Sequence, residues 1–136
     1  MPEKQTIQRA RKAKRQGKSA SSQAGEFVRE EIHHVREGKH GARSTKQAIA
    51  IGLSKARRSG VKLGTPRKGR ASASTRRKAA ADQRAGRKAS TRRPSAKRSQ
   101  ATRRALKREG RTAASRKALS RQARRAASSG RRKRAD

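Results

Sequence analysis

Apolar side chains recur at helical spacing in the first half of the chain and are sparse in the second. Over residues 23–37 they follow one another at intervals of four, four and three: Ala24, Val28, Ile32 and Val35. This spacing places them on one face of an α-helix. Gly38 ends the pattern. We therefore predict an amphipathic helix over residues 23–37, with its four glutamates on the outer face.

A second amphipathic helix is predicted over residues 45–59. Ser44 precedes it and Gln47 follows three residues later, which is the spacing of a capping box. Gly60 stands where a left-handed residue commonly ends a helix, and Val61 after it can pack back on the last turn. The two helices and the turn between them form a predicted helical hairpin.

The distribution of large apolar residues sets the predicted domain organisation. Of 13 apolar side chains larger than alanine, 11 come before residue 65. A chain with so few cannot bury enough surface to order all 136 residues. We therefore predict a small all-α fold, a helical hairpin or three-helix unit, followed by a long intrinsically disordered basic tail. The segments are a basic N-terminal stretch with a marginal helix (1–19), a helical head (20–64) and the tail (65–136).

Charge then indicates the partner. Residues 65–136 carry 27 lysines and arginines against 3 acidic residues, a net charge of +24 within a total of +35. A polycation gains affinity for nucleic acid by displacing condensed counterions. Arginine outnumbers lysine in the tail by 20 to 7, which favours bidentate phosphate contacts. Because Phe27 is the only aromatic residue, base stacking on single strands is disfavoured and duplex DNA is preferred over RNA.

The predicted nucleic-acid-binding residues are the basic side chains of the second predicted helix and the basic clusters of the tail. Residues 65–70 partly resemble an AT-hook, but Lys68 precedes its glycine and Ala71 replaces the expected proline. The predicted nucleic-acid-binding residues in the head are Lys46, Lys55, Arg57 and Arg58. Those in the tail are Arg67, Lys68, Arg70, Arg76, Arg77, Lys78, Arg87, Lys88, Arg92, Arg93, Arg103, Arg104, Arg116, Lys117, Arg124, Arg125, Arg131, Arg132, Lys133 and Arg134.

Other chemistry finds little support in the sequence. There is no cysteine, and the three histidines include an adjacent pair that points apart on a helix, so no metal site and no cofactor are predicted. No phosphate-binding loop, nucleophile elbow or perturbed carboxylate pair is present, so no enzyme activity is predicted. No apolar run approaches the length of a membrane span. We expect no membrane partner.

One segment of the chain resembles a known family. Residues 44–60, STKQAIAIGLSKARRSG, preceded by EGKHG at 37–41, are similar to the signature of a family of small basic bacterial proteins. That family is functionally uncharacterised, and its members are often described as DNA-binding proteins. The resemblance covers about residues 20–64 and implies a bacterial cytoplasm. The tail is similar to bacterial histone H1-like proteins in composition alone.

These observations predict a histone-like, nucleoid-associated protein that binds DNA without sequence preference, with self-association through the head an open question. One alternative is an RNA-binding or ribosome-associated protein, and another is a helical protein-interaction module with a localising tail. The tail is expected to be coil when free. Residues 96–109 and 113–127 have the alanine and arginine content to become helical once phosphates neutralise them.

Overall fold

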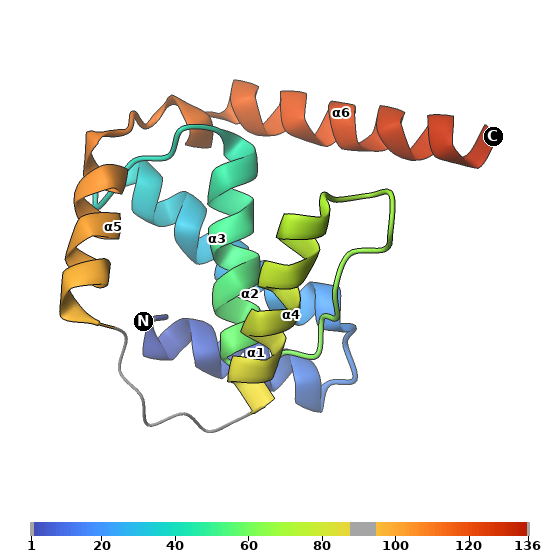
Figure 1. Ribbon diagram of the computed structural model, residues 1–136, viewed down its shortest axis with the longest axis horizontal. Coiled ribbons are helices and arrows are strands. Elements are labelled where there is room, and N and C mark those ends of the chain that lie inside the picture. The colour runs from blue at the N-terminus through green and yellow to red at the C-terminus, as the bar shows by residue number, and fades with distance from the viewer. Residues whose placement is uncertain (1, 88–94, 136) are drawn as a thin grey trace.

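The computed structural model describes residues 2–87 and 95–135 and is helical along most of that length (Figure 1). The first three helices are α1 (Lys4–Arg15), α2 (Ala20–Arg36) and α3 (Thr45–Arg58). They are followed by α4 (Ala73–Arg87), α5 (Ala96–Arg108), the 3-10 turn η1 (Thr112–Ala114) and α6 (Arg116–Ala135).

The three helices predicted before residue 65 are confirmed, together with the residues that begin and end α3. The Ser44 hydroxyl accepts a hydrogen bond from the Gln47 amide at 3.2 Å. Gly60 has φ +98°, its amide donates to the Arg57 carbonyl, and the Val61 amide donates to Ala56. These two bonds form a Schellman motif, so the predicted stop is confirmed in detail.

The core consists of two clusters on either side of the α2–α3 contact. One joins α1, α2 and α3 and is centred on Phe27, which is 1% exposed. The other joins α2 and α3 to η1 and α6, where Ala113 and Ala114 pack beside Val35. The two central helices approach closely because Gly52 has no side chain. A Cβ there would lie 2.6 Å from the Val28 Cα.

The predicted disordered tail is wrong. Within the described ranges, α4, α5, η1 and α6 are folded, and the second core cluster includes two tail alanines. The fold class is therefore an all-α body, with six α-helices in the part of the chain that the structure describes. The prediction failed because it counted large apolar side chains, whereas the tail is fixed by small residues and by polar contacts to the head.

Glycines let the tail approach the head backbone. A Cβ on Gly86 of α4 would lie 1.9 Å from the Arg57 carbonyl oxygen, and one on Gly41 would lie 1.8 Å from that of Glu109. The Gly41 amide donates to the Leu106 carbonyl at 2.7 Å, and the Ala42 amide to Gly110 at 3.0 Å. The tail therefore docks on the loop between α2 and α3 through main-chain hydrogen bonds.

Polar side chains hold α4 against the end of α3. The Gln83 amide donates to the Val61 carbonyl at 3.0 Å, and its oxygen accepts from the Gly64 amide at 3.1 Å. Asp82 accepts from Ser54 and Arg58 on α3, both at 2.8 Å. One of the few acidic residues of the tail is thus used to attach α4.

The predicted outward placement of the α2 glutamates is wrong for two of the four. Glu30 is 5% exposed and Glu31 is fully buried. Helical spacing cannot separate a solvated face from a second buried face, and here α1 covers Glu30 while Lys55 of α3 pairs with Glu31. These carboxylates are stabilised by polar partners at helix contacts.

Candidate nucleic-acid interface

A basic groove lies between the N-terminal end of α3 and the first turns of α6. It encloses about 520 Å³ and contains no acidic residue in its wall. The remaining wall is mainly hydroxyl groups, alanine and glutamine. Its cationic residues, here called the groove cations, are Arg43, Lys46, Lys117, Arg121 and Arg125.

Local structure fixes the two walls of this groove. The Thr45 hydroxyl, at the first position of α3, donates to the Ala113 carbonyl at 2.6 Å and so holds η1 against α3. Arg36 also donates to the Ala114 carbonyl, at 2.9 Å. The Ser115 hydroxyl accepts from the Ala118 amide at 3.1 Å, which begins α6 beside α3. Both walls are therefore held by bonds between segments far apart in the sequence.

The charged side chains in the groove wall are all positive. Neither α3 nor α6 contains an acidic residue. The free amide groups at the start of α3 add partial positive charge at the same place. The groove cations are all exposed. A polyanion that enters the groove therefore meets no fixed negative charge from its walls.

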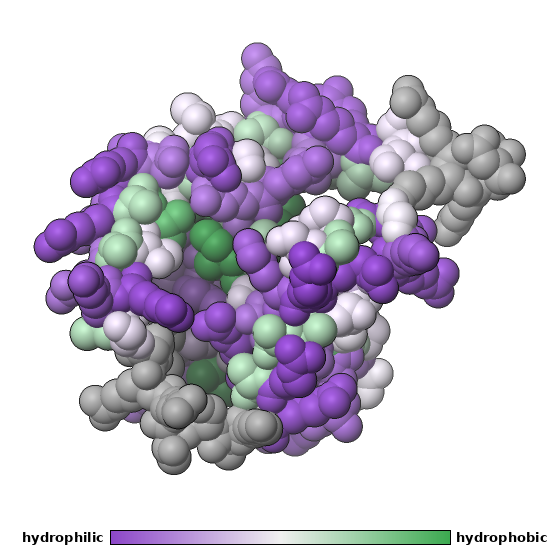
Figure 2. All heavy atoms as spheres, in the orientation of Figure 1, coloured by the Kyte–Doolittle hydropathy of each residue, from purple (hydrophilic) through white to green (hydrophobic). Residues whose placement is uncertain are grey.

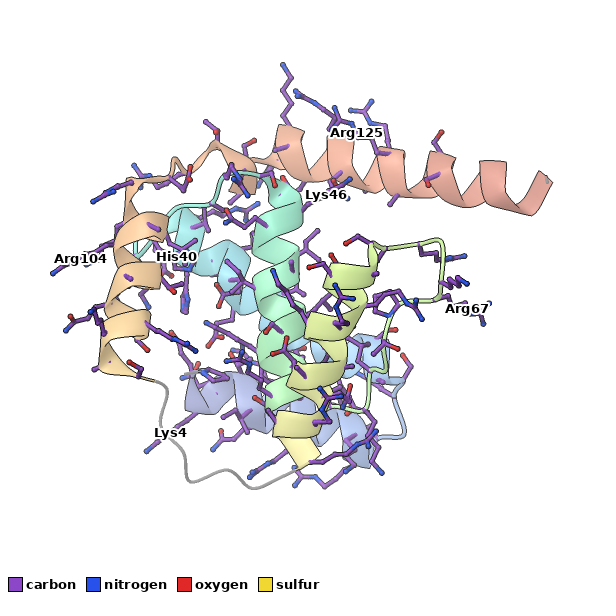
Figure 3. The ribbon with its side chains drawn as sticks, viewed as in Figure 1. Lys4, His40, Lys46, Arg67, Arg104 and Arg125 are labelled. Carbon is purple, nitrogen blue, oxygen red and sulfur yellow. The ribbon has the colours of Figure 1, made fainter. Side chains whose placement is uncertain are left out.

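Basic side chains also cover other parts of the tail. α5 has no buried residue, and Arg103 and Arg104 are exposed along it. Figure 3 shows Arg104, Arg125 and Arg67 directed outward on three sides of the molecule. Figure 2 shows hydrophilic residues over most of the face in view, with hydrophobic residues in a few patches between them.

The exposed cations are mostly without acidic partners. Within residues 2–87 and 95–130, the lysines and arginines that form ion pairs are Lys39, Lys55 and Arg58. Surface charge is usually mixed in sign. Here the imbalance leaves most of the basic groups available to an anionic partner.

Some predicted binding residues have internal roles. Lys55 bonds to the buried carboxylate of Glu31. The Arg57 Nε donates to the Gly64 carbonyl at 2.9 Å, and burial lowers the pKa of its guanidinium, against a smaller opposing effect of Asp82. Arg76 donates to the Pro66 carbonyl at 3.2 Å. Lys55 and Arg57 therefore contribute to the fold more than to the surface.

The other predicted residues fall into three groups by position. Lys88, Arg92 and Arg93 lie outside the described residues. The side chains of 131–134 lie outside the description, although their backbone continues α6. Exposed positions hold Lys46, Arg58, Arg67, Lys68, Arg70, Arg77, Lys78, Arg87, Arg103, Arg104, Arg116, Lys117, Arg124 and Arg125.

Sequence reasoning missed Arg43 and Arg121 as members of the groove. A signal for Arg121 was present, because positions 117, 121 and 125 are spaced by four and so share one helical face. No comparable local signal marks Arg43. Its place depends on the contact between η1 and α3, which joins residues 68 positions apart.

Comparison with known proteins gives a match to one protein family and assigns no activity. Residues 11–69 match the model of a family of unknown function, DUF6496. The match runs from the middle of α1 to the loop before α4. No curated protein and no solved structure gives a significant match to the chain. Among the described residues, no helix is both long enough and apolar enough to span a membrane.

Proposed function

We propose that this protein binds duplex DNA through its phosphates, with little sequence preference, in the bacterial nucleoid. The observation that carries the proposal is the acid-free basic groove between α3 and α6. Four of the five groove cations are on the folded helices α3 and α6, and Arg43 lies in the loop just before α3, so the proposed contact surface is preformed and not a flexible tail.

The proposed mechanism is phosphate neutralisation from several helices at once. The groove takes one stretch of backbone, and the exposed basic residues of α5 and α6 contact phosphates on either side. An arginine guanidinium can donate hydrogen bonds to two oxygens of one phosphate at once. These contacts fix the orientation of the protein on the DNA without reading the bases. Each neutralised phosphate releases counterions, and that release supplies most of the binding free energy.

DNA is favoured over single-stranded RNA by the absence of a stacking platform. Proteins that bind single strands stack bases on exposed aromatic rings. The chain has no tyrosine and no tryptophan, and its one phenylalanine, Phe27, is buried in the core. Bases therefore have no exposed Phe, Tyr or Trp ring to stack on, and a regular double helix of phosphates is the better match.

The test is the salt dependence of binding to a labelled duplex of about 30 base pairs, measured by fluorescence anisotropy. Contact with about ten phosphates gives a slope of log affinity against log salt near −9. Two unrelated duplex sequences should bind within about twofold of each other. A slope shallower than about −3, or tighter binding to an RNA of equal length at matched salt, contradicts the proposal.

The groove is tested by a triple variant, Lys117→Gln, Arg121→Gln and Arg125→Gln. Loss of three phosphate contacts should make the slope shallower by about 2.7. The matched control removes the same charges from exposed positions of α1: Arg11→Gln, Lys12→Gln and Arg15→Gln. Equal losses in the two variants would mean that net charge alone determines binding and that the groove has no special role.

A further inference from the structure

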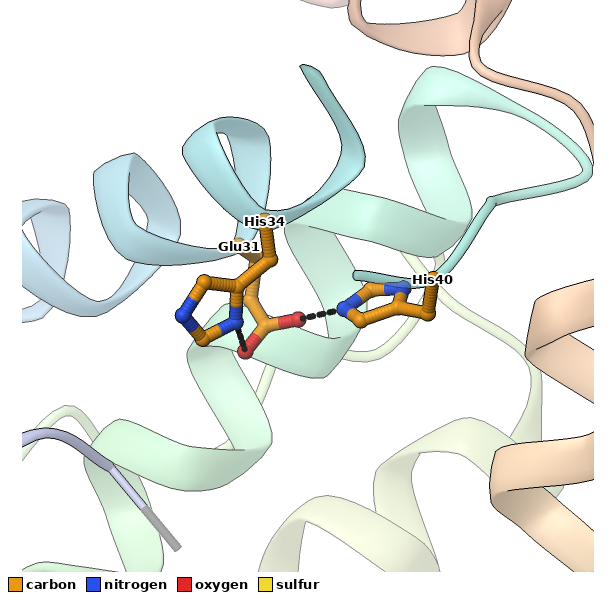
Figure 4. Close-up of side chains that lie close together, drawn as sticks. All are labelled: Glu31, His34 and His40. Atoms are coloured by element: carbon orange, nitrogen blue, oxygen red, sulfur yellow. Dashed lines mark hydrogen bonds and ion pairs between the residues drawn. The ribbon is translucent and has the colours of Figure 1, made fainter. Parts of the chain in front are cut away.

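The buried carboxylate of Glu31 lies between two imidazole rings (Figure 4). His34 follows it by three residues on α2, and His40 returns from the loop after α2. The His40 Nε2 is 3.0 Å from Glu31 Oε2, and the His34 Nδ1 is 3.9 Å from Oε1. The two ring centroids are 5.9 Å apart and edge-on to each other. Three nitrogen and oxygen ligands therefore converge on one buried point.

Each imidazole has its other nitrogen held by an oxygen acceptor. The His40 Nδ1 is 2.8 Å from the Gly41 carbonyl, which can only accept, so this nitrogen carries hydrogen. The His34 Nε2 is 3.1 Å from a carboxylate oxygen of Glu3. The two remaining nitrogens, His40 Nε2 and His34 Nδ1, both face the carboxylate of Glu31.

This arrangement is the one that metal-binding histidines adopt. A ligating imidazole commonly donates its second N–H to a carbonyl or carboxylate, which fixes the ring and directs the other nitrogen at the ion. Lys55 neutralises one oxygen of Glu31, and Oε2 faces His40.

We propose that Glu31, His34 and His40 bind a divalent first-row transition metal of the Zn²⁺ class. Two imidazoles and one carboxylate suit Zn²⁺ or Co²⁺, whereas Mg²⁺ and Ca²⁺ prefer oxygen ligands. The three ligand atoms lie within 4.8 Å of one another. Zn–N bonds of about 2.0–2.1 Å require ligands about 3.3 Å apart, so small rotations of the side chains complete the site.

The surroundings favour a cation despite the positive charge of the chain. Glu30, next to Glu31, has one buried oxygen without a hydrogen-bond partner within the described structure. Glu3, Glu30 and His34 form an adjoining cluster that shares one histidine with the proposed site. A hollow of about 270 Å³ opens beside His34, and its wall carries basic residues as well as glutamates: Glu3, Glu30, Glu37, Arg9, Arg29 and Lys39. The adjoining cluster and this hollow therefore meet at His34, one of the three proposed ligands.

Metal binding would connect α2 to the loop on which the tail docks. His40 precedes Gly41, whose amide bonds to the Leu106 carbonyl of α5. An ion that fixes His40 to α2 also fixes this docking point. The proposal therefore predicts that metal protects residues 100–115 from hydrogen exchange, a result independent of DNA binding.

The experiment uses the full-length protein without an affinity tag, stripped of metal with a chelator. Calorimetry with Zn²⁺ should give one site with a dissociation constant of ~10 μM or tighter. Co²⁺ should give visible absorption bands of a low-coordination nitrogen and oxygen site. The amides of residues 100–115 should exchange more slowly after Zn²⁺ is added. Mg²⁺ should do none of these.

His34→Gln and His40→Gln should each weaken Zn²⁺ binding by about tenfold or more. The matched control is His33→Gln, because His33 is adjacent on α2 but exposed and outside the cluster. Circular dichroism checks that each variant is folded. The Zn²⁺ titration of the wild-type protein tests the proposal even if a variant does not fold. Absence of a 1:1 Zn²⁺ complex in the wild type overturns the proposal, as does an equal loss in His33→Gln. Either result would assign the cluster to an ion-pair network only.

Discussion

The described residues before residue 65 and those after it belong to one folded body but are held by different interactions. The first region has a core of large apolar side chains around Phe27, with helices ended by glycine. The second contributes alanines, main-chain hydrogen bonds and two polar side chains of α4. The comparison shows that a segment poor in large apolar residues can still be ordered when another segment offers it a template.

The first prediction tests the core of residues 1–64. Phe27→Ala should lower the free energy of unfolding by about 3–5 kcal/mol, because it removes a fully buried ring and leaves a cavity. All described helices should unfold together, since the tail depends on the head. Chemical denaturation followed by circular dichroism measures this, with Phe27→Leu as a milder control of under about 1.5 kcal/mol. If helices α4–α6 stayed folded after the head had unfolded, the tail would not depend on the head for its structure.

The second prediction tests the docking of the tail. Gly41→Ala should release α5 and η1 at a cost of about 3 kcal/mol, because its Cβ would lie 1.8 Å from the Glu109 carbonyl oxygen. Hydrogen exchange should rise at residues 96–115 and stay slow in α2 and α3. The control is Gly25→Ala, an exposed position of α2 with no atom near its Cβ. There a slight gain in stability is expected.

A smaller effect is expected for the attachment of α4. Gln83→Ala should cost about 2 kcal/mol, because the Val61 carbonyl and the Gly64 amide lose their partner. The loss should appear as faster exchange of α4 alone. Gln100→Ala on exposed α5 serves as the control, and equal effects of the two substitutions would show that Gln83 has no special role.

The smallest predicted change concerns the bond between α3 and η1. Thr45→Val keeps the side-chain shape and removes the hydrogen bond to the Ala113 carbonyl, at a cost of about 1 kcal/mol. Thr102→Val, at an exposed site on α5, is the matched control and should be nearly neutral. If Thr45→Val leaves DNA affinity and stability unchanged, this bond does not hold the groove in shape.

Sequence patterns predicted α1, α2 and α3 because their determinants are local. Helical spacing, the Ser44 cap and the Gly60 stop all act within a few residues. The order of the tail could not be predicted in this way. Its buried alanines, Ala113 and Ala114, look like solvated residues in sequence, and their partners lie on α2 and α3.

The candidate sites show the same division. Most predicted basic residues are exposed because charge alone keeps them at the surface, as for Arg103 and Arg104. The convergence of Glu31, His34 and His40 could not be predicted from the adjacent histidines. It depends on the path of the loop after Gly38, which brings His40 back to α2.

The long acid-free helix α6 makes dissolved ions act on this protein in two opposing ways. Its arginines and lysines repel one another along the helix at spacings of three and four residues, and added salt weakens that repulsion. Salt should therefore raise the helix content of the free protein while it lowers affinity for DNA. The phosphates of bound DNA reduce the same repulsion. At low salt, binding to a duplex should therefore order the C-terminal end of α6, which is expected to fray in the free protein.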